Sequence, residues 1–267
     1  MTRMETPALV AETLSDGVLT LAMGAAPAHP LSLAMVGALQ AALDRAAEND
    51  AVRVIVIEGP GHIFCAGHDL KELTVHRADE DRGRAFFTRT MKLCAEVMQT
   101  IVHLPVPVIA EVDGLATAAG CQLVASCDLA MCTDTSTFCT PGVNIGLFCS
   151  TPMVALSRNV HRKQAMEMLL TGETIDASTA REFGLINRIM PRQYLNQVVM
   201  KYAEVIASKS PLTVKIGKEA FYRQAEMSLE DAYEYTAGVM VENMLARDAE
   251  EGIGAFIAKR KPEWTGE

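Results

Sequence analysis

Two segments of the sequence place backbone amides where they can bind a negatively polarised oxygen. The first, Phe64–Leu73 (FCAGHDLKEL), follows an apolar run and opens a predicted helix, with Gly67 at the turn and Asp69 as the helix cap. The second, Val112–Leu123 (VDGLATAAGCQL), repeats the order of strand, glycine turn, small residues and helix. Amides at helix starts have no partner within their own helix. If the amides of the two segments meet, they form an oxyanion hole, which stabilises negative charge on an acyl oxygen. The alternative is that both are ordinary turns, with glycine where the backbone requires it.

Strands and helices alternate through the part of the chain that must position these segments. Val52–Ile57 and Val106–Val112 are almost wholly apolar, as expected for strands covered on both faces. Because a strand–helix–strand order is typical of parallel sheets, we predict an α/β fold. The other predicted elements are strands at Leu9–Leu14, Val18–Met23 and Leu129–Cys132, a helix capped by Ser32, and a helix from Thr117 to Ser126.

The last third of the chain is predominantly helical in its periodicity. A short strand at Leu185–Met190 is the exception. We expect helices near 192–208, 212–226, 228–246 and 248–260, which would form a C-terminal helical layer.

Composition excludes several classes of function. The 267 residues carry a net charge of −9, which argues against a nucleic-acid or anionic-membrane surface. No apolar run approaches the roughly 18 residues that span a bilayer. The seven cysteines are odd in number and form neither a C-x-x-C pair nor a tight cluster with histidine, so we expect no disulfide framework and no metal site. We therefore expect a soluble, cytoplasmic protein.

Four segments, in their order along the chain, resemble the motifs of the crotonase family, also called the enoyl-CoA hydratase/isomerase family. They are Phe64–Leu73, Glu111–Ala130, Phe138–Leu147 and Asp248–Trp264, and the likeness covers essentially the whole chain. It implies a crotonase-like spiral of ββα units with a C-terminal helical layer. It also implies a spiral core with an acyl-CoA pocket over residues 1–200, a helical trimerisation region over residues 201–267, and assembly as a homotrimer or a dimer of trimers.

The same resemblance implies a partner and a site. The partner is an acyl-CoA thioester, so coenzyme A enters as part of the substrate and no cofactor is bound covalently. The thioester carbonyl would accept hydrogen bonds from the backbone amides of His68 and Ala119. Contacts with CoA are implied for residues around the first amide and for two C-terminal residues that meet the CoA of a neighbouring subunit. These residues are Ala66, His68, Asp69, Leu70, Lys71, Phe256 and Lys259.

One loop departs from the family pattern at the CoA site. The family usually has a basic residue and an asparagine ahead of its first helix, whereas this chain has His29 and Pro30. We include His29 among the expected CoA contacts and predict a weaker phosphate or adenine contact from this loop than is usual.

Both expected catalytic carboxylates are missing. Hydratases of the family use two glutamates to activate water, and this chain has Gln122 at the first position and Gly142 at the second. Because neither an amide nor a glycine transfers protons at neutral pH, hydration by that route is not expected. The resemblance therefore predicts an enoyl-CoA hydratase/isomerase-like enzyme of fatty acid metabolism, a lyase or isomerase, that binds a CoA thioester and stabilises its enolate.

Two other functions stay open. Loss of CO₂ from a malonyl-type thioester needs no base, and Ala66–Asp69 (AGHD) resembles the same segment of the family's methylmalonyl-CoA decarboxylases, although His68 can serve through its backbone alone. A non-catalytic acyl-CoA-binding protein is the other alternative. Cys149 is a candidate catalytic group, and its alternative role is a small apolar residue lining the pocket.

Overall fold

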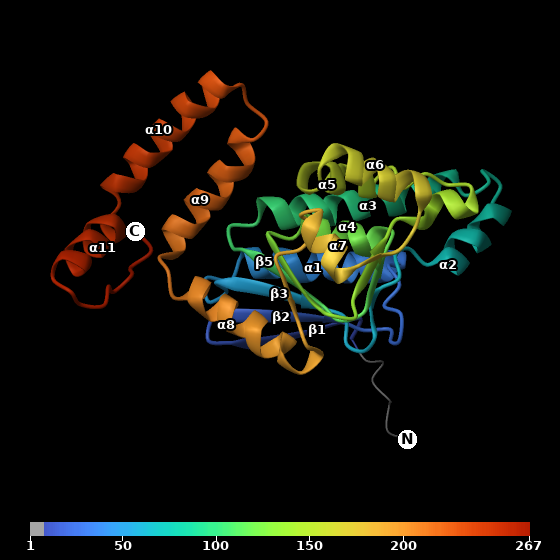
Figure 1. The fold of residues 1–267 in the computed structure, drawn as a ribbon, viewed down its shortest axis with the longest axis horizontal. Helices are drawn as coiled ribbons and strands as arrows, with labels where there is room; N and C mark the ends of the chain where they lie inside the picture. Colours follow the sequence, from blue (N-terminus) through green and yellow to red (C-terminus); the bar gives the residue numbers. More distant parts are fainter. Residues whose placement is uncertain (1–7) are drawn as a thin grey trace.

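A six-stranded sheet forms the base of the molecule. The structure is a computed structural model that describes residues 8–267 (Figure 1). The strand order is β1-β2-β3-β5-β7-β10, with β1 antiparallel to β2 and every other pair parallel. The strands are β1 Val10–Ser15, β2 Val18–Met23, β3 Val54–Glu58, β5 Val108–Val112, β7 Leu129–Thr133 and β10 Arg188–Met190.

A second, smaller sheet is formed by short strands that alternate along the chain with strands of the large sheet. Its strands run in the order β4-β6-β8-β9, of which the first three are parallel. Three successive units each give one strand to the large sheet, the next strand to the small sheet, and then a helical turn: β3–β4–α2, β5–β6–α4 and β7–β8–η2. This repetition is the predicted spiral of ββα units. The small strands are β4 Ile63–Cys65, β6 Leu115–Thr117, β8 Thr137–Cys139 and β9 Ile175–Asp176.

Helices cover both faces of the large sheet. In β3, Val54 and Val56 pack beneath α8, whereas Ile55 and Ile57 join the larger core on the opposite face, where α1 and α3 lie. The helices are α1 Leu33–Ala47, α2 Leu70–Val75, α3 Arg84–His103, α4 Ala119–Ser126, α5 Pro152–Asn159, α6 Arg162–Thr171, α7 Ala177–Glu182, α8 Leu195–Ala207, α9 Pro211–Gln224, α10 Leu229–Leu245 and α11 Arg247–Ile257, with 3₁₀ turns η1 His76–Ala78, η2 Pro141–Ile145 and η3 Arg192–Tyr194.

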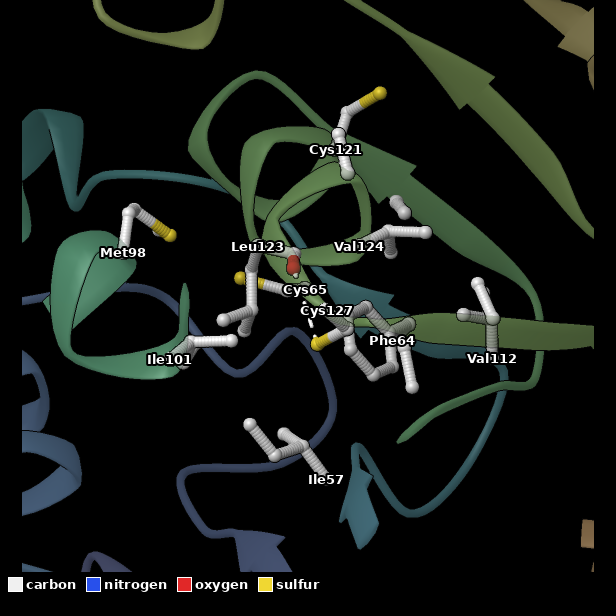
Figure 2. Close-up of a cluster of buried hydrophobic side chains, with 14 of the residues drawn as sticks. Ile57, Phe64, Cys65, Met98, Ile101, Val112, Cys121, Leu123, Val124 and Cys127 are labelled. Carbon is white, nitrogen blue, oxygen red and sulfur yellow. Dashed lines mark hydrogen bonds between the residues drawn. The ribbon is translucent and has the colours of Figure 1, made fainter. Parts of the chain in front are cut away.

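The helix α4 is buried over its whole length in the larger core. Figure 2 shows Leu123 and Val124 of this helix among the side chains of Ile57, Phe64 and Ile101. All eight of its residues are buried, and the ends of β4 and β6 pack against it. A helix held on all sides fixes the position of the peptide groups at its start.

The C-terminal helices project from one end of the molecule, and a buried ion pair ties them to the core. In Figure 1, α9 and α10 lie side by side, and α11 lies beyond them. Lys218 of α9 donates to the carbonyl oxygens of Ile101 at 2.8 Å and Val106 at 3.0 Å and to Asp128 Oδ2 at 2.7 Å. The Tyr222 hydroxyl donates to Asp128 Oδ1 at 2.9 Å. This network sets the direction in which the helical region leaves the core.

The α/β prediction is confirmed, and most predicted elements lie within a few residues of the observed ones. The predicted helix from Thr117 is wrong at its start, because Thr117 ends β6 and α4 begins at Ala119. The predicted strand Leu185–Met190 is shorter, at Arg188–Met190. The short strands of the small sheet were not predicted. Two or three residues are too few to show an alternating pattern.

Two carboxyl groups face each other beneath α8. Glu58 and Glu111 are register partners on β3 and β5, and Asn196 of α8 donates to Glu111 Oε2 at 3.3 Å. Burial, together with the charges of Glu58 and Asp113, raises the pKa of Glu111 from 4.5 to about 7. Burial also raises the pKa of Glu58. Near pH 7 the folded protein therefore holds a proton here that the unfolded chain releases.

The variant Glu111→Gln tests this carboxyl pair. Because the pKa of Glu111 is raised on folding, the stabilising protonated form is complete below about pH 4.5 and is lost as the pH rises through 7. We expect the variant to match the wild type near pH 4.5 and to exceed its free energy of unfolding by about 2–3 kcal/mol at pH 8. Urea unfolding across this range measures the difference. The exposed Glu182→Gln is the control, and parallel pH curves for Glu111→Gln and the wild type would contradict the assignment.

The variant Lys218→Met tests the network that ties α9 to the core. It leaves a partly buried carboxylate and two carbonyl groups without their donor, so we expect a loss of about 3–5 kcal/mol in the free energy of unfolding. Tyr222→Phe removes one hydrogen bond and should cost about 1 kcal/mol. The exposed Lys215→Met, on the same helix, should cost little. A cost for Lys218→Met no larger than that of Lys215→Met would show that the network does not hold the helix.

Candidate functional site

The parallel pairing of β4 with β6 brings the two predicted segments together. Ile63 pairs with Leu115, and Cys65 pairs with Ala116. His68 and Ala119 each lie three residues beyond this last pair, His68 in the turn before α2 and Ala119 as the first residue of α4. Because parallel strands end at the same edge of a sheet, the two turns lie next to each other.

Two glycines allow the turns to approach closely. Gly67 has a φ of +78°, and a Cβ added there would lie 3.0 Å from Ala118 Cβ and 3.2 Å from Ala119 N. A Cβ on Gly120 would lie 2.3 Å from the carbonyl oxygen of Cys65, closer than real contacts allow. The chain around residue 67 is therefore in van der Waals contact with the start of α4.

The amides of this region divide into bonded and free groups. The Asp69 side chain accepts from Lys71 N at 2.9 Å and Glu72 N at 3.2 Å, which confirms the predicted helix cap. Within residues 8–267, neither His68 N nor Ala119 N donates a hydrogen bond. Two N–H groups without acceptors in adjacent turns can bind one oxygen of a ligand.

The His68 side chain is held at one nitrogen only. Its Nδ1 lies 3.2 Å from the carbonyl oxygen of Leu31 and donates to it, since that oxygen can only accept. Burial lowers the pKa of His68, so the ring is neutral at pH 7. Its Nε2 is therefore the unprotonated nitrogen, and it is buried without a hydrogen-bond partner in residues 8–267.

The two positions of the missing glutamates lie in the same region but differ in the room they offer. Gln122 is buried one turn into α4, and its Oε1 has no partner in the described chain. Gly142 lies in η2, just after β8, the next strand beside β6. A Cβ there would lie 2.8 Å from the Leu147 carbonyl oxygen and 2.9 Å from Cys149 Sγ. A side chain at 142 therefore requires the 147–149 segment to move.

Cys149 is a poor nucleophile in this environment. Its thiol is buried against Gly142, and burial raises its pKa, so it stays protonated at neutral pH. The six other cysteines are also buried. Across residues 8–267, no three His, Cys, Asp or Glu side chains are grouped so that they could hold a metal ion.

The residues expected to contact CoA fall into three groups. Leu70 and Lys71 are exposed at the start of α2, beside the two free amides. Phe256 is 85% exposed on α11, and Lys259 follows it, at the opposite end of the molecule from α2 (Figure 1). His29 is 1% exposed, with both ring nitrogens next to carbonyl oxygens, so its side chain does not face a ligand.

Backbone hydrogen bonds that support this site were not predicted from the sequence. The loop before α1 runs alongside residues 65–68, where Ala66 N donates to the Ala28 carbonyl oxygen at 2.9 Å and Leu31 N donates to the Gly67 carbonyl oxygen at 2.8 Å. Leu31 and His68 form an isolated parallel bridge. No pattern of residue types signals such a contact, because it involves peptide groups alone.

Comparisons with known proteins decide the family. Residues 14–267 match the family model described as "Enoyl-CoA hydratase/isomerase". The chain belongs to this family, the crotonase superfamily. A human relative named "Enoyl-CoA hydratase domain-containing protein 3, mitochondrial" is 49% identical over 90% of this chain and 77% of its own length.

Solved structures of family members have the same fold. The crystal structure of human enoyl-CoA hydratase domain-containing protein 3 has a TM-score of 0.91 at 46% identity, covering 96% of this chain and 100% of that one. A structure named as an enoyl-CoA hydratase from Mycobacterium smegmatis also has a TM-score of 0.91, at 45% identity over 96% and 98% of the two chains. The crotonase-like fold is thereby confirmed.

The predicted cytoplasmic location is wrong. Similar family members from human, rat and mouse, at 46–49% identity, are named mitochondrial proteins. The reduced cysteines that led to the prediction argue against a secreted disulfide scaffold, and they do not separate one reducing compartment from another. No helix within residues 8–267 is long and apolar enough to cross a membrane.

The variant Gly120→Ala tests the close contact between the two turns of this family member. The added methyl group would collide with the Cys65 carbonyl oxygen, so we expect the free energy of unfolding to fall by about 2–3 kcal/mol. Chemical denaturation measures it. Gly217→Ala in α9 is the matched control, because no atom lies within 4 Å of its added Cβ, and it should gain about 0.5–1 kcal/mol. Equal stability of the two variants would refute the close contact.

Proposed function

We propose that this chain is an acyl-CoA-processing enzyme that binds a CoA thioester and stabilises its enolate between the amides of His68 and Ala119. The observation that carries the proposal is the register of β4 and β6, which supports the convergence of two amides without acceptors. As the carbonyl oxygen gains negative charge, both N–H groups bind it more tightly than in the substrate. Removing one such donor from an oxyanion hole typically costs about 10²–10³ in rate.

The chemistry proposed here does not rely on a carboxylate pair. Gln122 can donate a hydrogen bond and orient a substrate group, but it cannot remove a proton. Gly142 contributes no side chain, and its surroundings leave no room for one. We therefore expect hydration of crotonyl-CoA to be at least about 10²-fold slower than in a relative with both glutamates.

Contacts with the CoA moiety are proposed from two places. Ala66, Asp69, Leu70 and Lys71 surround the first amide, and Lys71 offers an exposed positive charge to a phosphate. Phe256 and Lys259 are proposed to reach the CoA of a neighbouring subunit. His29 is left out of these contacts because its side chain is buried.

We propose a homotrimer or a dimer of trimers, with residues 201–267 as the trimerisation region and residues 1–200 as the spiral core. Support comes from large apolar side chains exposed along the C-terminal helices, more than a monomer normally leaves in water. They include Phe221, Leu229, Tyr233, Leu245, Phe256 and Ile257.

A comparison of two ligands tests the proposed carbonyl contact. Crotonyl-CoA carries the thioester oxygen, whereas a CoA thioether of the same chain length lacks it. We expect the thioester to raise the thermal midpoint more, with a Kd at least about tenfold lower, since hydrogen bonds to a polarised oxygen contribute about 1.5–3 kcal/mol. Thermal shift and calorimetry with purified protein give both values.

Turnover is measured in the same samples. Absorbance of crotonyl-CoA follows hydration, and CO₂ release from methylmalonyl-CoA follows decarboxylation. Equal affinity for the thioester and the thioether would contradict the carbonyl contact. Tight thioester binding with no turnover of either substrate would contradict the proposed enzymatic activity. The remaining function would then be that of a non-catalytic acyl-CoA-binding protein.

A further inference from the structure

Three turns that lead from the large sheet into the small one lie against one another. Each joins a strand of the large sheet to a strand of the small sheet, and their residues are 59–62, 113–114 and 134–136. The last carbonyl oxygen of one turn accepts from the first residue after the next turn. The His62 oxygen accepts from Leu115 N at 3.4 Å, and the Gly114 oxygen accepts from Thr137 N at 3.2 Å. The small sheet therefore starts from a stack of turns.

A side chain ties the second turn to the third. Ser136 Oγ accepts from Gly114 N at 3.1 Å and donates to the Val112 carbonyl oxygen at 3.0 Å, and Ser136 is buried. The equivalent position in the second turn is Gly114, where an added Cβ would lie 1.9 Å from the His62 carbonyl oxygen. Because no side chain fits at this position, a similar tie between the first and second turns has to come from another part of the chain.

Arg192 of η3 supplies this tie. Its Nε lies 2.6 Å from Asp113 Oδ2 in the second turn, and its Nη2 donates to the Gly61 carbonyl oxygen in the first turn at 2.8 Å. A guanidinium presents its donors in a rigid planar fork, so it holds two partners in a fixed relation. Met190, two residues before Arg192, accepts from Asp134 N of the third turn at 3.0 Å. The arginine is therefore anchored next to the stack that it ties.

The strand pairing that follows these turns is short and irregular. Strands β4 and β6 have three residues each. Ile63 pairs with Leu115 and Cys65 with Ala116, and the register shifts between these two pairs. A bulge of this kind leaves a residue unpaired and disrupts the ladder locally. The ladder alone thus fixes the register weakly, and the ties at its start contribute to the position of everything that follows it, including the two proposed amides.

We propose that Arg192 is a positioning residue for the oxyanion hole. By binding Asp113 and Gly61 at once, it fixes the two turns that lead into β4 and β6, and with them the position of the His68 amide relative to the Ala119 amide. This role rests on the proposed function, whereas the contact between the turns does not. A displacement of about 1 Å can reduce a rate about 10²-fold even when its cause lies far from the reacting atoms.

The ion pair by itself contributes little to folding. The Arg192 side chain is 47% exposed and that of Asp113 is 20% exposed. Exposed ion pairs stabilise proteins weakly, because water screens both charges. Removal of Arg192 should therefore lower the thermal midpoint by no more than a few degrees and still change the hole. A merely structural ion pair would give the first effect without the second.

Infrared spectroscopy of a bound thioester measures the change at the hole. Crotonyl-CoA with a ¹³C carbonyl reports how strongly the hole polarises the oxygen. Glutamine is shorter than arginine and lacks its fork, so in Arg192→Gln we expect a smaller shift of the carbonyl band and a Kd about tenfold higher. Arg188→Gln is the matched control, because it removes one side-chain hydrogen bond of an exposed arginine on β10. An unchanged band and Kd in Arg192→Gln would overturn the proposal.

A second variant shows whether Arg192 acts through the turn after β5. Asp113→Asn keeps the size of the side chain and removes its charge, so we expect the same two changes to a smaller extent. The double variant should be no worse than Arg192→Gln alone, because both substitutions interrupt one contact. Additive losses would overturn the proposal. Loss of folding in both single variants would also overturn it, since the ion pair is assigned a small share of the stability.

Hydrogen exchange separates this role from the proposed function. In ligand-free Arg192→Gln, followed by mass spectrometry, peptides over residues 62–68 and 113–119 should exchange several-fold faster than in the wild type, whereas peptides over α1 should not change. Equal exchange in the two proteins would overturn the proposal without any ligand. If crotonyl-CoA does not bind the wild type at all, the proposed function fails, and the exchange result alone then decides whether Arg192 fixes the two turns.

Discussion

The pairing of Cys65 with Ala116 is the contact on which the rest of the site depends. It brings the turn after β4 next to the start of α4, where a Cβ added to Gly67 would lie 3.2 Å from Ala119 N. The large sheet makes this pairing possible, because β3 and β5 are register partners one step earlier in each unit. A shift of either strand by one residue would separate the amides and reverse its buried face.

A site built from peptide groups tolerates side-chain change in a way that a carboxylate pair does not. Gly67 and Gly120 are constrained by space, since a methyl group at either position meets the opposing turn. The side chains at 68 and 119 meet no such limit from the function of their amides. Gln122 and Gly142 could therefore replace glutamates while the fold and the two amides were retained, and the family likeness by itself does not identify the reaction.

The sequence predicted what depends on residue type over several positions. The apolar strands β3 and β5, the Asp69 cap and the two glycine turns all carry side-chain patterns with a direct physical cause, and each was found. The strands β4, β6 and β8 were not, because three residues give no period and their pairing is made by peptide groups. The burial of His29 was missed for the same reason: its partners are two carbonyl oxygens, which leave no mark in the sequence.

The two histidines of this region differ in how the backbone surrounds their rings. His68 meets one carbonyl oxygen, from Leu31, and keeps its other nitrogen without a partner, so burial favours the neutral ring. His29 is 1% exposed, and its two ring nitrogens lie at hydrogen-bond distance from the carbonyl oxygens of Gly24 and Pro60. The His29 ring thus links the loop before α1 to the loop after β3, and hydrogen bonds between residues 28–31 and residues 65–67 connect the loop before α1 to the turn that carries the His68 amide.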